Sequence, residues 1–293
     1  MKFQGLYTAI VTPFKDNKID TAAFRSLIEA QIAAGVDGIV PVGTTGESPT
    51  LSYEEHHEVI RLCIEFVAGR CQVIAGTGSN ATDEAILLTQ EAAAMGADGT
   101  LQVCPYYNKP NQEGVYQHFK AIAECSPLPI MLYSVPGRSG IEIAPETVAR
   151  LAKDCPTIIA IKEAGGSVER VNKLKQAVPA DFSILSGDDA LTVPFISCGA
   201  CGLVSVTSNL VPALMKELVD TANSGDAKKA LELQVKAYPL MSGLMGFDSN
   251  PIPIKAALAL RGDISWEVRL PLTPLADEKR QALTQLMTSY GLI

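Results

Sequence analysis

The chain has 293 residues, of which 47% are hydrophobic and 19% are charged, and its mean hydropathy is +0.17. This composition can fill a substantial core and excludes an extended disordered protein. A formal net charge of −8 without any block of lysine or arginine excludes the basic surface of proteins that bind nucleic acid or anionic membranes. No signal-peptide pattern and no run of about 18 apolar residues is present, so we expect a cytoplasmic protein that acts on small molecules.

Eight apolar runs, rich in β-branched residues and bounded by turn residues, predict eight strands. Segments with helical periodicity separate these runs. This alternation is typical of a (β/α)₈ TIM barrel, and buried parallel strands explain why the runs are nearly continuous. A doubly wound open sheet is the alternative fold. In chain order the predicted strands cover residues 8–14, 38–43, 72–76, 99–104, 129–135, 157–162, 182–186 and 202–206.

Capping residues mark several helix ends between these strands. Ser52 begins a capping box, Pro145 lies at a helix start, and Ser167 opens a further helix. Glycines that follow helical segments predict left-handed caps at residues 35, 69 and 96.

Strand signals stop after residue 210, and only helical patterns follow. They cover residues 211–222, 227–245, 251–259 and 277–290. No linker rich in serine or glycine separates them from the rest of the chain. We therefore predict a barrel that carries the active site in residues 1–224 and a helical extension in residues 225–293 that packs on it.

Lys162 closes the apolar run 158–161, where a hydrophobic residue would be expected. A buried ammonium group either finds a carboxylate or loses its proton, and a neutral lysine can form an imine with a ketone. The alternatives are a lysine whose stem packs while its ammonium group meets water, and an imine on another lysine such as Lys255.

Side-chain alternation predicts a tyrosine beside this lysine. If Ile158 and Ala160 face the barrel interior, Lys162 faces it too. On the preceding strand, Tyr133 faces the interior together with Met131. A phenol in that place could carry the protons that imine and enamine formation require. A tyrosine packed only for its aromatic ring is the alternative.

Two further strand ends carry groups that suit carboxylates. Gly43-Thr44-Thr45-Gly46 offers main-chain amides for one carboxylate, and Arg138, beyond the strand of Tyr133, offers a bidentate donor for a second. A structural glycine turn and a surface arginine are the respective alternatives.

Three other patterns carry less weight. The run Gly76–Ala81 fits a dinucleotide-binding fingerprint, but it follows the third strand, so a nucleotide-binding oxidoreductase is only an alternative. Cys198 and Cys201 end a helix rather than begin one, which favours packing thiols. The three histidines lack metal-ligand spacing, so we do not expect a metal, and imine chemistry on a lysine requires no cofactor.

Several motifs together are similar to one family. They are residues 42–48 (Val-Gly-Thr-Thr-Gly-Glu-Ser), 74–78, 105–108, 132–133, 161–164, 185–189 and 250–253 (Asn-Pro-Ile-Pro). With these motifs the chain resembles, from end to end, the bacterial dihydrodipicolinate synthase (4-hydroxy-tetrahydrodipicolinate synthase) family of the pyruvate-dependent class I aldolase superfamily.

The resemblance implies a lyase without a cofactor, which condenses pyruvate with L-aspartate 4-semialdehyde in diaminopimelate and lysine biosynthesis. Lys162 would form the Schiff base with pyruvate. Tyr133, Thr44 and Tyr107 would form a proton relay, with Tyr107 contributed by a neighbouring subunit of a homotetramer that is a dimer of dimers. Amides near Thr44 and Thr45 would hold the pyruvate carboxylate.

The resemblance also implies which residues line the rest of the pocket and which acceptor the enzyme uses. Main chain at Gly187 and Val204 would line the pocket, and Arg138 would bind the carboxylate of the semialdehyde. An aldolase or lyase of the N-acetylneuraminate lyase or keto-deoxy-sugar-acid type is the alternative, and sialic-acid lyases lack this arginine. Ser134 replaces an asparagine that is common in the family.

Feedback inhibition by lysine is a further implication of the resemblance. Glu84 would pair with the lysine ammonium group, whereas Tyr53 stands where sensitive members usually have histidine. The matching positions are Ser48, Pro49, Tyr53, His56, Asn80, Glu84 and Tyr106.

Overall fold

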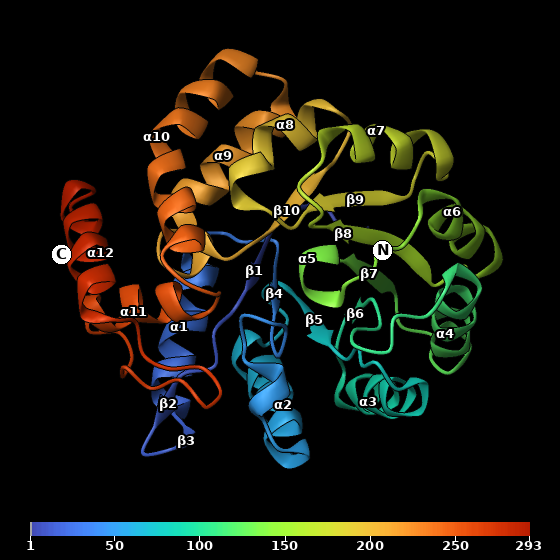
Figure 1. Ribbon diagram of the computed structural model, residues 1–293, viewed down its shortest axis with the longest axis horizontal. Helices are drawn as coiled ribbons and strands as arrows, with labels where there is room; N and C mark the ends of the chain where they lie inside the picture. Colours follow the sequence, from blue (N-terminus) through green and yellow to red (C-terminus); the bar gives the residue numbers. More distant parts are fainter. Residues whose placement is uncertain (1) are drawn as a thin grey trace.

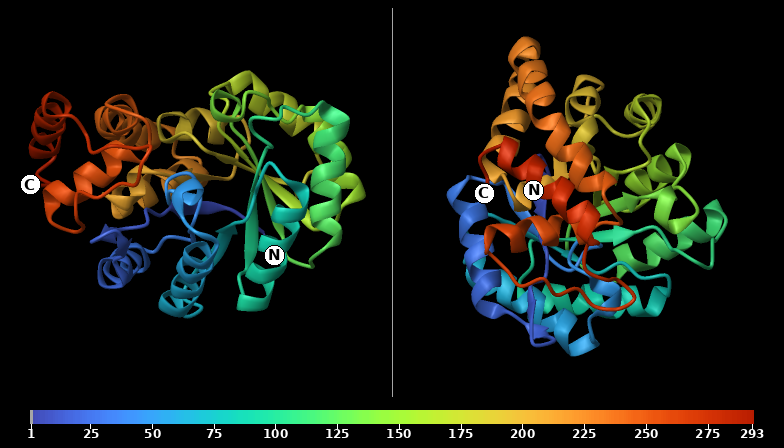
Figure 2. Two further views of the ribbon diagram at one scale, coloured as in Figure 1. Left: turned by 60° about the horizontal axis from the view of Figure 1, so that its bottom comes forward. Right: turned by 60° about the vertical axis from the view of Figure 1, so that its left-hand side comes forward.

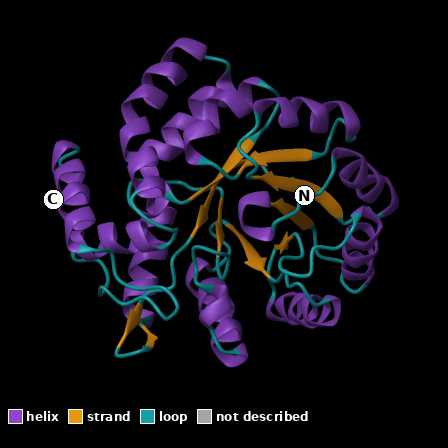
Figure 3. Cartoon of the chain, viewed as in Figure 1, coloured by secondary structure: helices purple, strands orange, loops and turns teal. Residues whose placement is uncertain are grey.

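The computed structural model describes residues 2–293 and contains a closed barrel of eight parallel strands. They are β1 (Gly5–Ala9), β4 (Gly38–Val40), β5 (Gln72–Gly76), β6 (Gly99–Val103), β7 (Ile130–Ser134), β8 (Ile158–Glu163), β9 (Ser183–Ser186) and β10 (Gly202–Ser205). Consecutive barrel strands are neighbours, and β10 closes the barrel on β1. Helices form a ring around the strands (Figure 3). The predicted (β/α)₈ barrel is confirmed, and the doubly wound sheet is excluded.

Helices follow the barrel strands and cover the outside of the barrel, except for the short α5, which lies over its mouth (Figure 1). They are α1 (Thr21–Ala33), α2 (Tyr53–Val67), α3 (Thr82–Met95), α4 (Gln112–Glu124), α5 (Pro136–Ser139), α6 (Pro145–Asp154), α7 (Val168–Ala177), α8 (Thr192–Ser197) and α9 (Pro212–Ser224). The C-terminal helices α10 (Ala227–Gly246), α11 (Ile252–Arg261) and α12 (Asp277–Ser289) follow them (Figure 1). Within residues 2–293, no helix combines the length and the hydropathy needed to cross a membrane.

The helix caps follow the sequence closely. Ser52 and Glu55 form the predicted capping box at the start of α2, and Ser167 caps α7 through its side chain. Gly96 ends α3 with a φ of 90°. At the end of α2 the left-handed cap begins one residue early, because Ala68 adopts a φ of 47° before Gly69.

The first strand lies closer to the N-terminus than the predicted range 8–14. It begins at Gly5, whose φ is 86°, and the next amide, of Leu6, donates to the Asp37 carboxylate at 2.8 Å. Phe14 belongs instead to a small hairpin of β2 (Phe14–Lys15) and β3 (Lys18–Ile19). The hairpin was not predicted.

A bulge on β8 changes the alternation of side chains at the start of that strand. Ile130 pairs with Ile158, but Met131 pairs with Ala160, so Ile159 is the additional residue. Ile158 therefore packs in the layer outside the barrel, whereas Ala160 lies in the inner cluster. The expectation that Ile158 faces inward is wrong, and the expectation for Ala160 is confirmed.

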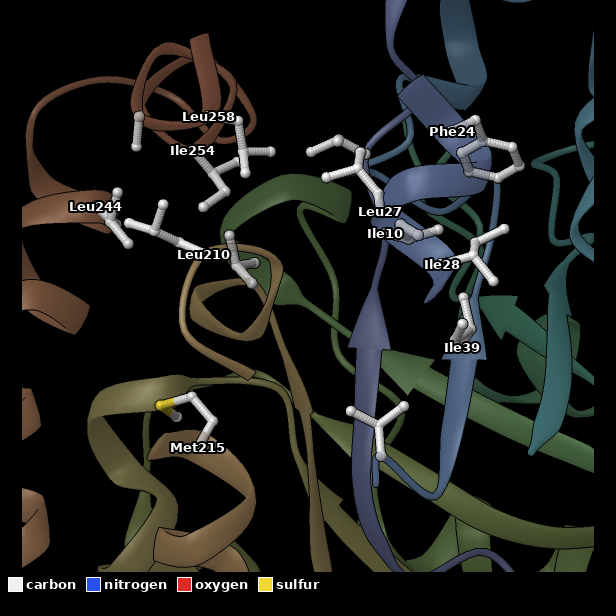
Figure 4. Close-up of a cluster of buried hydrophobic side chains, with 14 of the residues drawn as sticks. Ile10, Phe24, Leu27, Ile28, Ile39, Leu210, Met215, Leu244, Ile254 and Leu258 are labelled. Carbon is white, nitrogen blue, oxygen red and sulfur yellow. The ribbon is translucent and has the colours of Figure 1, made fainter. Parts of the chain in front are cut away.

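The C-terminal helices share an apolar core with the barrel. Leu244 of α10 and Ile254 and Leu258 of α11 belong to one buried cluster (Figure 4). The same cluster contains Leu27 and Leu210 from the barrel part of the chain. Figure 2 shows the three helices together on one side of the barrel. Burial of this apolar surface fixes the extension on the barrel.

Candidate active site

Lys162 and Tyr133 lie side by side inside the barrel. They are register partners on β8 and β7, and the Lys162 Nζ lies 4.3 Å from the centroid of the Tyr133 ring. Both side chains are buried, with exposures of 6% and 7%. The structure therefore brings together the amine and the phenol that the alternation of side chains predicts.

Two lysines of the described chain are buried, but their surroundings differ. Lys255 is paired with Glu47, at 2.5 Å between Nζ and Oε1, and its Nζ also donates to the Thr12 carbonyl at 3.0 Å. Burial lowers the pKa of Lys255, and Glu47 opposes that effect. Lys162, in contrast, has no carboxylate within 4 Å among residues 2–293. Its amine is thus the better candidate for imine formation, and Lys255 is an ion-pair lysine.

Gly187 lies where the chain passes close to Lys162, and Val204 lies in the inner apolar cluster of the barrel. A Cβ at Gly187 would come within 2.8 Å of the Lys162 Cε, so only glycine leaves room for that side chain. The Gly187 amide donates to the Glu163 carbonyl at 2.7 Å, which holds the turn. Val204 is fully buried in the inner cluster together with Leu185.

The turn after β4 presents main-chain amides. The Gly46 amide donates to the Gly43 carbonyl at 3.0 Å, and the Glu47 amide donates to the Thr44 carbonyl at 3.1 Å. Within residues 2–293, the amides of Thr44 and Thr45 have no hydrogen-bond acceptor. Two adjacent amides without acceptors form a nest that suits a carboxylate.

A cavity of about 250 Å³ lies next to these groups. Thr44, Tyr133 and Arg138 line it, together with Tyr106 and Val135. Lys162, Thr45 and Val204 are each at most 6% exposed and lie outside this lining. The cavity has room for a small organic acid, and Arg138 on α5 gives it a cation.

Tyr107 is separated from this cavity within one copy of the chain. It is 91% exposed and has a φ of 72°, a conformation that is unusual for a residue with a side chain. Its neighbours are fixed, because Asn108 donates to the Asn80 carbonyl at 2.8 Å and Asn80 donates to the Tyr106 carbonyl at 3.2 Å. One chain therefore does not bring Tyr107 together with Lys162.

A second cavity, of about 260 Å³, adjoins the first. Both are lined by Ser48, Pro49, Gly78 and Tyr106. Asn80 is not part of the second lining and contacts it through Tyr106. The predicted lysine-site residues that line the second cavity are Ser48, Pro49, Tyr53, His56, Glu84 and Tyr106.

The second cavity carries a carboxylate and an imidazole. Glu84 accepts a hydrogen bond from the Ser79 hydroxyl, and the Tyr53 hydroxyl donates to Glu91 outside the cavity. The His56 Nε2 lies 3.0 Å from the Gly76 carbonyl oxygen, and burial lowers the pKa of His56. Glu84 therefore supplies the negative charge that a cationic ligand would require.

The glycines of the fingerprint-like run 76–81 have steric causes. A Cβ at Gly76 would lie 2.6 Å from the Val42 carbonyl oxygen, and one at Gly78 would lie 2.3 Å from the Val103 nitrogen. Close approach of neighbouring main chain accounts for both positions. Cys198 and Cys201 are free thiols, as are the other five cysteines.

Comparison with known proteins shows similarity along nearly the whole chain. A model of the dihydrodipicolinate synthetase family matches residues 2–290. The chain belongs to this family. The 4-hydroxy-tetrahydrodipicolinate synthase of Syntrophus aciditrophicus (strain SB) is 53% identical over 291 residues, which cover 99% of each chain. The solved 4-hydroxy-tetrahydrodipicolinate synthase of Methylacidiphilum fumariolicum SolV is 53% identical, with a TM-score of 0.97, over 98% of this chain and 95% of that chain.

Two further structures of dihydrodipicolinate synthetase family members contain ligands. The chloride-inhibited dihydrodipicolinate synthase of Acinetobacter baumannii, complexed with pyruvate, is 46% identical with a TM-score of 0.96 and covers 99% of both chains. The dihydrodipicolinate synthase of Cyanidioschyzon merolae with lysine bound is 43% identical with a TM-score of 0.95, also over 99% of both chains. The family membership that the motifs indicate is confirmed.

Two residues of this family member had no predicted role, although both lie in the quoted motifs. Asn250 donates to the Thr45 hydroxyl at 3.0 Å, and its carbonyl accepts from Arg138 at 3.1 Å. Glu47 is the buried partner of Lys255. A lysine inside the apolar segment 252–260 was the one signal that a buried carboxylate must lie nearby.

Proposed function

We propose that the protein is a 4-hydroxy-tetrahydrodipicolinate synthase, a lyase that condenses pyruvate with L-aspartate 4-semialdehyde. This is the first committed step of diaminopimelate and lysine biosynthesis. The observation that carries the proposal is the buried amine of Lys162, which has no carboxylate partner within residues 2–293 and lies against Tyr133. Relatives that carry this name, at about half identity over the full length, support it.

The first half of the reaction forms an enamine on Lys162. The amine attacks C2 of pyruvate, and the ketone oxygen leaves as water to give an imine. Loss of a proton from C3 then gives the enamine, with Tyr133, Thr44 and Tyr107 as the proton relay. The amides of Thr44 and Thr45 hold the pyruvate carboxylate during both steps, while Gly187 leaves room for the lysine stem.

The second half joins the two substrates. The electron pair of the enamine forms a C–C bond to the aldehyde carbon of the acceptor, and the aldehyde oxygen takes a proton. The amine of the acceptor then attacks the imine carbon and displaces Lys162 as the ring closes. Arg138 binds the acceptor carboxylate at the mouth of the cavity, and Val204 is buried with Leu185 in the apolar cluster inside the barrel.

The test is a pair of assays on the same preparation. We expect product formation from pyruvate and aspartate semialdehyde when the downstream reductase is coupled, and no cleavage of N-acetylneuraminate. Activity in the cleavage assay alone would instead identify an aldolase of the sugar-acid type.

Replacement of Arg138 by alanine tests whether this residue binds the acceptor rather than pyruvate. We expect the KM for aspartate semialdehyde to rise about 10- to 100-fold, because a charge-assisted pair is lost, while borohydride still traps pyruvate on Lys162. Arg138→Lys keeps the charge without the bidentate geometry and should be intermediate. An unchanged KM for the acceptor would contradict the proposed role.

We also propose a cytoplasmic homotetramer, a dimer of dimers, in which the partner subunit's Tyr107 completes the relay of each site. The exposed, strained position of Tyr107 supports this arrangement. Residues 1–224 and 225–293 would be its barrel and its extension. No nucleic acid, membrane or cofactor is required for the reaction.

Mixing two inactive variants tests the contribution of Tyr107. Tyr107→Phe and Tyr133→Phe should each lower kcat by about 10²- to 10⁴-fold. In a mixed dimer one site has both native tyrosines, so co-refolded variants should recover about a quarter of the native sites if pairing is random. If both residues acted within one chain, mixing would restore nothing.

Finally, we propose that L-lysine binds in the second cavity as a feedback inhibitor. The carboxylate of Glu84 would pair with its ammonium group, and the shared residues Ser48, Pro49, Gly78 and Tyr106 would transmit the effect to the first cavity. The relative with lysine bound supports this proposal.

Glu84→Gln should raise the lysine concentration for half-inhibition by about tenfold or more, because the charged partner is removed. Calorimetry of lysine binding and the coupled assay both measure this change. Glu113→Gln, which removes an exposed surface charge paired with Arg150, is the matched control and should leave the lysine response unchanged. Equal inhibition of Glu84→Gln and native enzyme would exclude this pocket.

A further inference from the structure

The segment between α10 and α11 touches both groups that bind substrate carboxylates. Asn250 lies in this segment and is 7% exposed. Its side-chain amide donates to the Thr45 hydroxyl at 3.0 Å, and its main-chain carbonyl accepts from the Arg138 guanidinium at 3.1 Å. One residue of the C-terminal extension therefore connects the turn that contains Thr44 and Thr45, called the pyruvate turn below, with Arg138, the proposed binding residue for the acceptor.

A buried ion pair anchors the same segment to the pyruvate turn from a second point. Lys255, five residues after Asn250, pairs with Glu47, which is two residues after Thr45. Both side chains are at most 2% exposed. The second oxygen of Glu47 accepts the main-chain amide of Arg269 at 2.9 Å, also from the extension. The extension thus holds this turn at Thr45 and again at Glu47.

The backbone of the turn depends on these contacts. Glu47 adopts a left-handed φ of 55°, which costs free energy for a residue with a side chain. The Thr12 hydroxyl donates to the Gly46 carbonyl at 2.7 Å, and Lys255 donates to the Thr12 carbonyl. The segment that follows β1, the turn and α11 therefore form one connected network, in which the turn is held by partners outside it.

We propose that Asn250 is a positioning residue of the condensation, which fixes the spacing between the Thr44–Thr45 amide nest and Arg138, and that the Glu47–Lys255 pair holds it in place. This inference rests on the proposed function, because it requires two substrates that each carry a carboxylate. The enamine carbon and the aldehyde carbon meet only when both carboxylates are held at the right separation.

The hydrogen bonding of Asn250 favours a positioning role over a stabilising one. Its side-chain oxygen is buried and has no partner among the described residues. An unpaired buried acceptor destabilises a fold, so stability alone does not favour asparagine at this position. Asparagine does provide the hydrogen bond from its side-chain amide to the Thr45 hydroxyl, and this contact supports a positioning role.

The test compares Asn250→Ala with the native enzyme and with Lys279→Ala. Lys279 pairs with Asp248 on the surface of the same segment, so its removal is a matched control that touches neither Thr45 nor Arg138. For each protein, three quantities are measured: KM and kcat for both substrates, the extent of borohydride trapping of pyruvate at Lys162, and the midpoint of urea unfolding.

Asn250→Ala should lower kcat/KM for the acceptor by about 10- to 100-fold, the effect of a small misplacement of reacting groups. Trapping at saturating pyruvate should persist, and Lys279→Ala should behave as the native enzyme. Values of kcat/KM within twofold of native for both substrates would overturn the inference.

The double variant Glu47→Gln/Lys255→Met removes the buried charges together and keeps the shape of the pair. It should show the same selective loss for the acceptor per folded molecule. A fall in the unfolding midpoint with unchanged kcat/KM would show a merely structural pair and overturn the role assigned to it. Failure of the native enzyme to trap pyruvate would contradict the proposed function itself, whereas native activity with unaffected variants would overturn this inference alone.

Discussion

Replacement of Lys162 by methionine eliminates the reduced pyruvate adduct and lowers kcat/KM by about 10⁴-fold or more, as expected when a covalent nucleophile is removed. The methionine fills nearly the same space in the barrel, so the fold should persist. Incubation with pyruvate and borohydride, followed by peptide mass mapping, measures the adduct, and the coupled assay measures kcat/KM.

The native enzyme provides the control for the position of the adduct. Mapping should find it on the peptide that contains Lys162 and not on the peptide that contains Lys255, since the latter ammonium group is engaged by Glu47. An adduct on Lys255, or a persisting adduct in Lys162→Met, would refute the proposed nucleophile.

The second large effect is expected on stability, at Arg170. This guanidinium joins the outer faces of β7 and β8, because its Nε donates to Glu163 at 2.7 Å and its Nη2 donates to the Ser134 hydroxyl at 3.3 Å and the Ile143 carbonyl at 2.5 Å. Arg170→Met leaves the fully buried Glu163 without its partner, and we expect a loss of about 3–5 kcal/mol in the free energy of unfolding.

The pH dependence of this loss follows from the pKa of Glu163. Burial raises that pKa and Arg170 opposes the effect, so removal of Arg170 should raise it further. A carboxyl group with a raised native pKa binds its proton more tightly in the folded state, and stability falls as pH rises through the range between the two pKa values. The deficit of Arg170→Met should therefore shrink in acid and be largest at neutral pH.

Urea unfolding at several pH values measures both effects. Glu142→Gln is the matched control, because this exposed partner of Arg170 should contribute less than about 1 kcal/mol. The double variant Glu163→Leu/Arg170→Met should be more stable than Arg170→Met, since no buried charge remains. Equal stability of Arg170→Met and native protein at neutral pH would exclude the proposed pairing.

The barrel could be predicted from sequence because its signals are local. Continuous apolar runs, the capping box at Ser52 and the cap at Gly96 each determine a short piece of structure from adjacent residues. The place of Lys162 beside Tyr133 also follows, because alternation along a strand and adjacency of strands are regular. The bulge at Ile159 shows the limit of that rule, since it inverts the alternation for Ile158 alone.

One further feature could have been predicted from the sequence but was missed, and another could not have been predicted from it. The residues Asp16 and Asn17, both with left-handed φ, form a two-residue hairpin turn of a recognisable type, although the flanking strands are only two residues long. The contact of Asn250 with Thr45 spans 205 positions of sequence, and no local pattern encodes it. Contacts of that kind arise from how the extension docks on the barrel.

The separation of 208 positions between Glu47 and Lys255 has a consequence for synthesis of the chain on the ribosome. At about 5–20 residues per second, Lys255 is added to the chain about 10–40 s after Glu47, the residue with which it pairs. During this interval the nascent barrel carries a carboxylate that cannot be buried without cost. We therefore expect the turn at residues 43–47 to reach its native conformation only after α11 has been synthesised, and a chain truncated before α11 should lack the Lys255 contact that holds this turn.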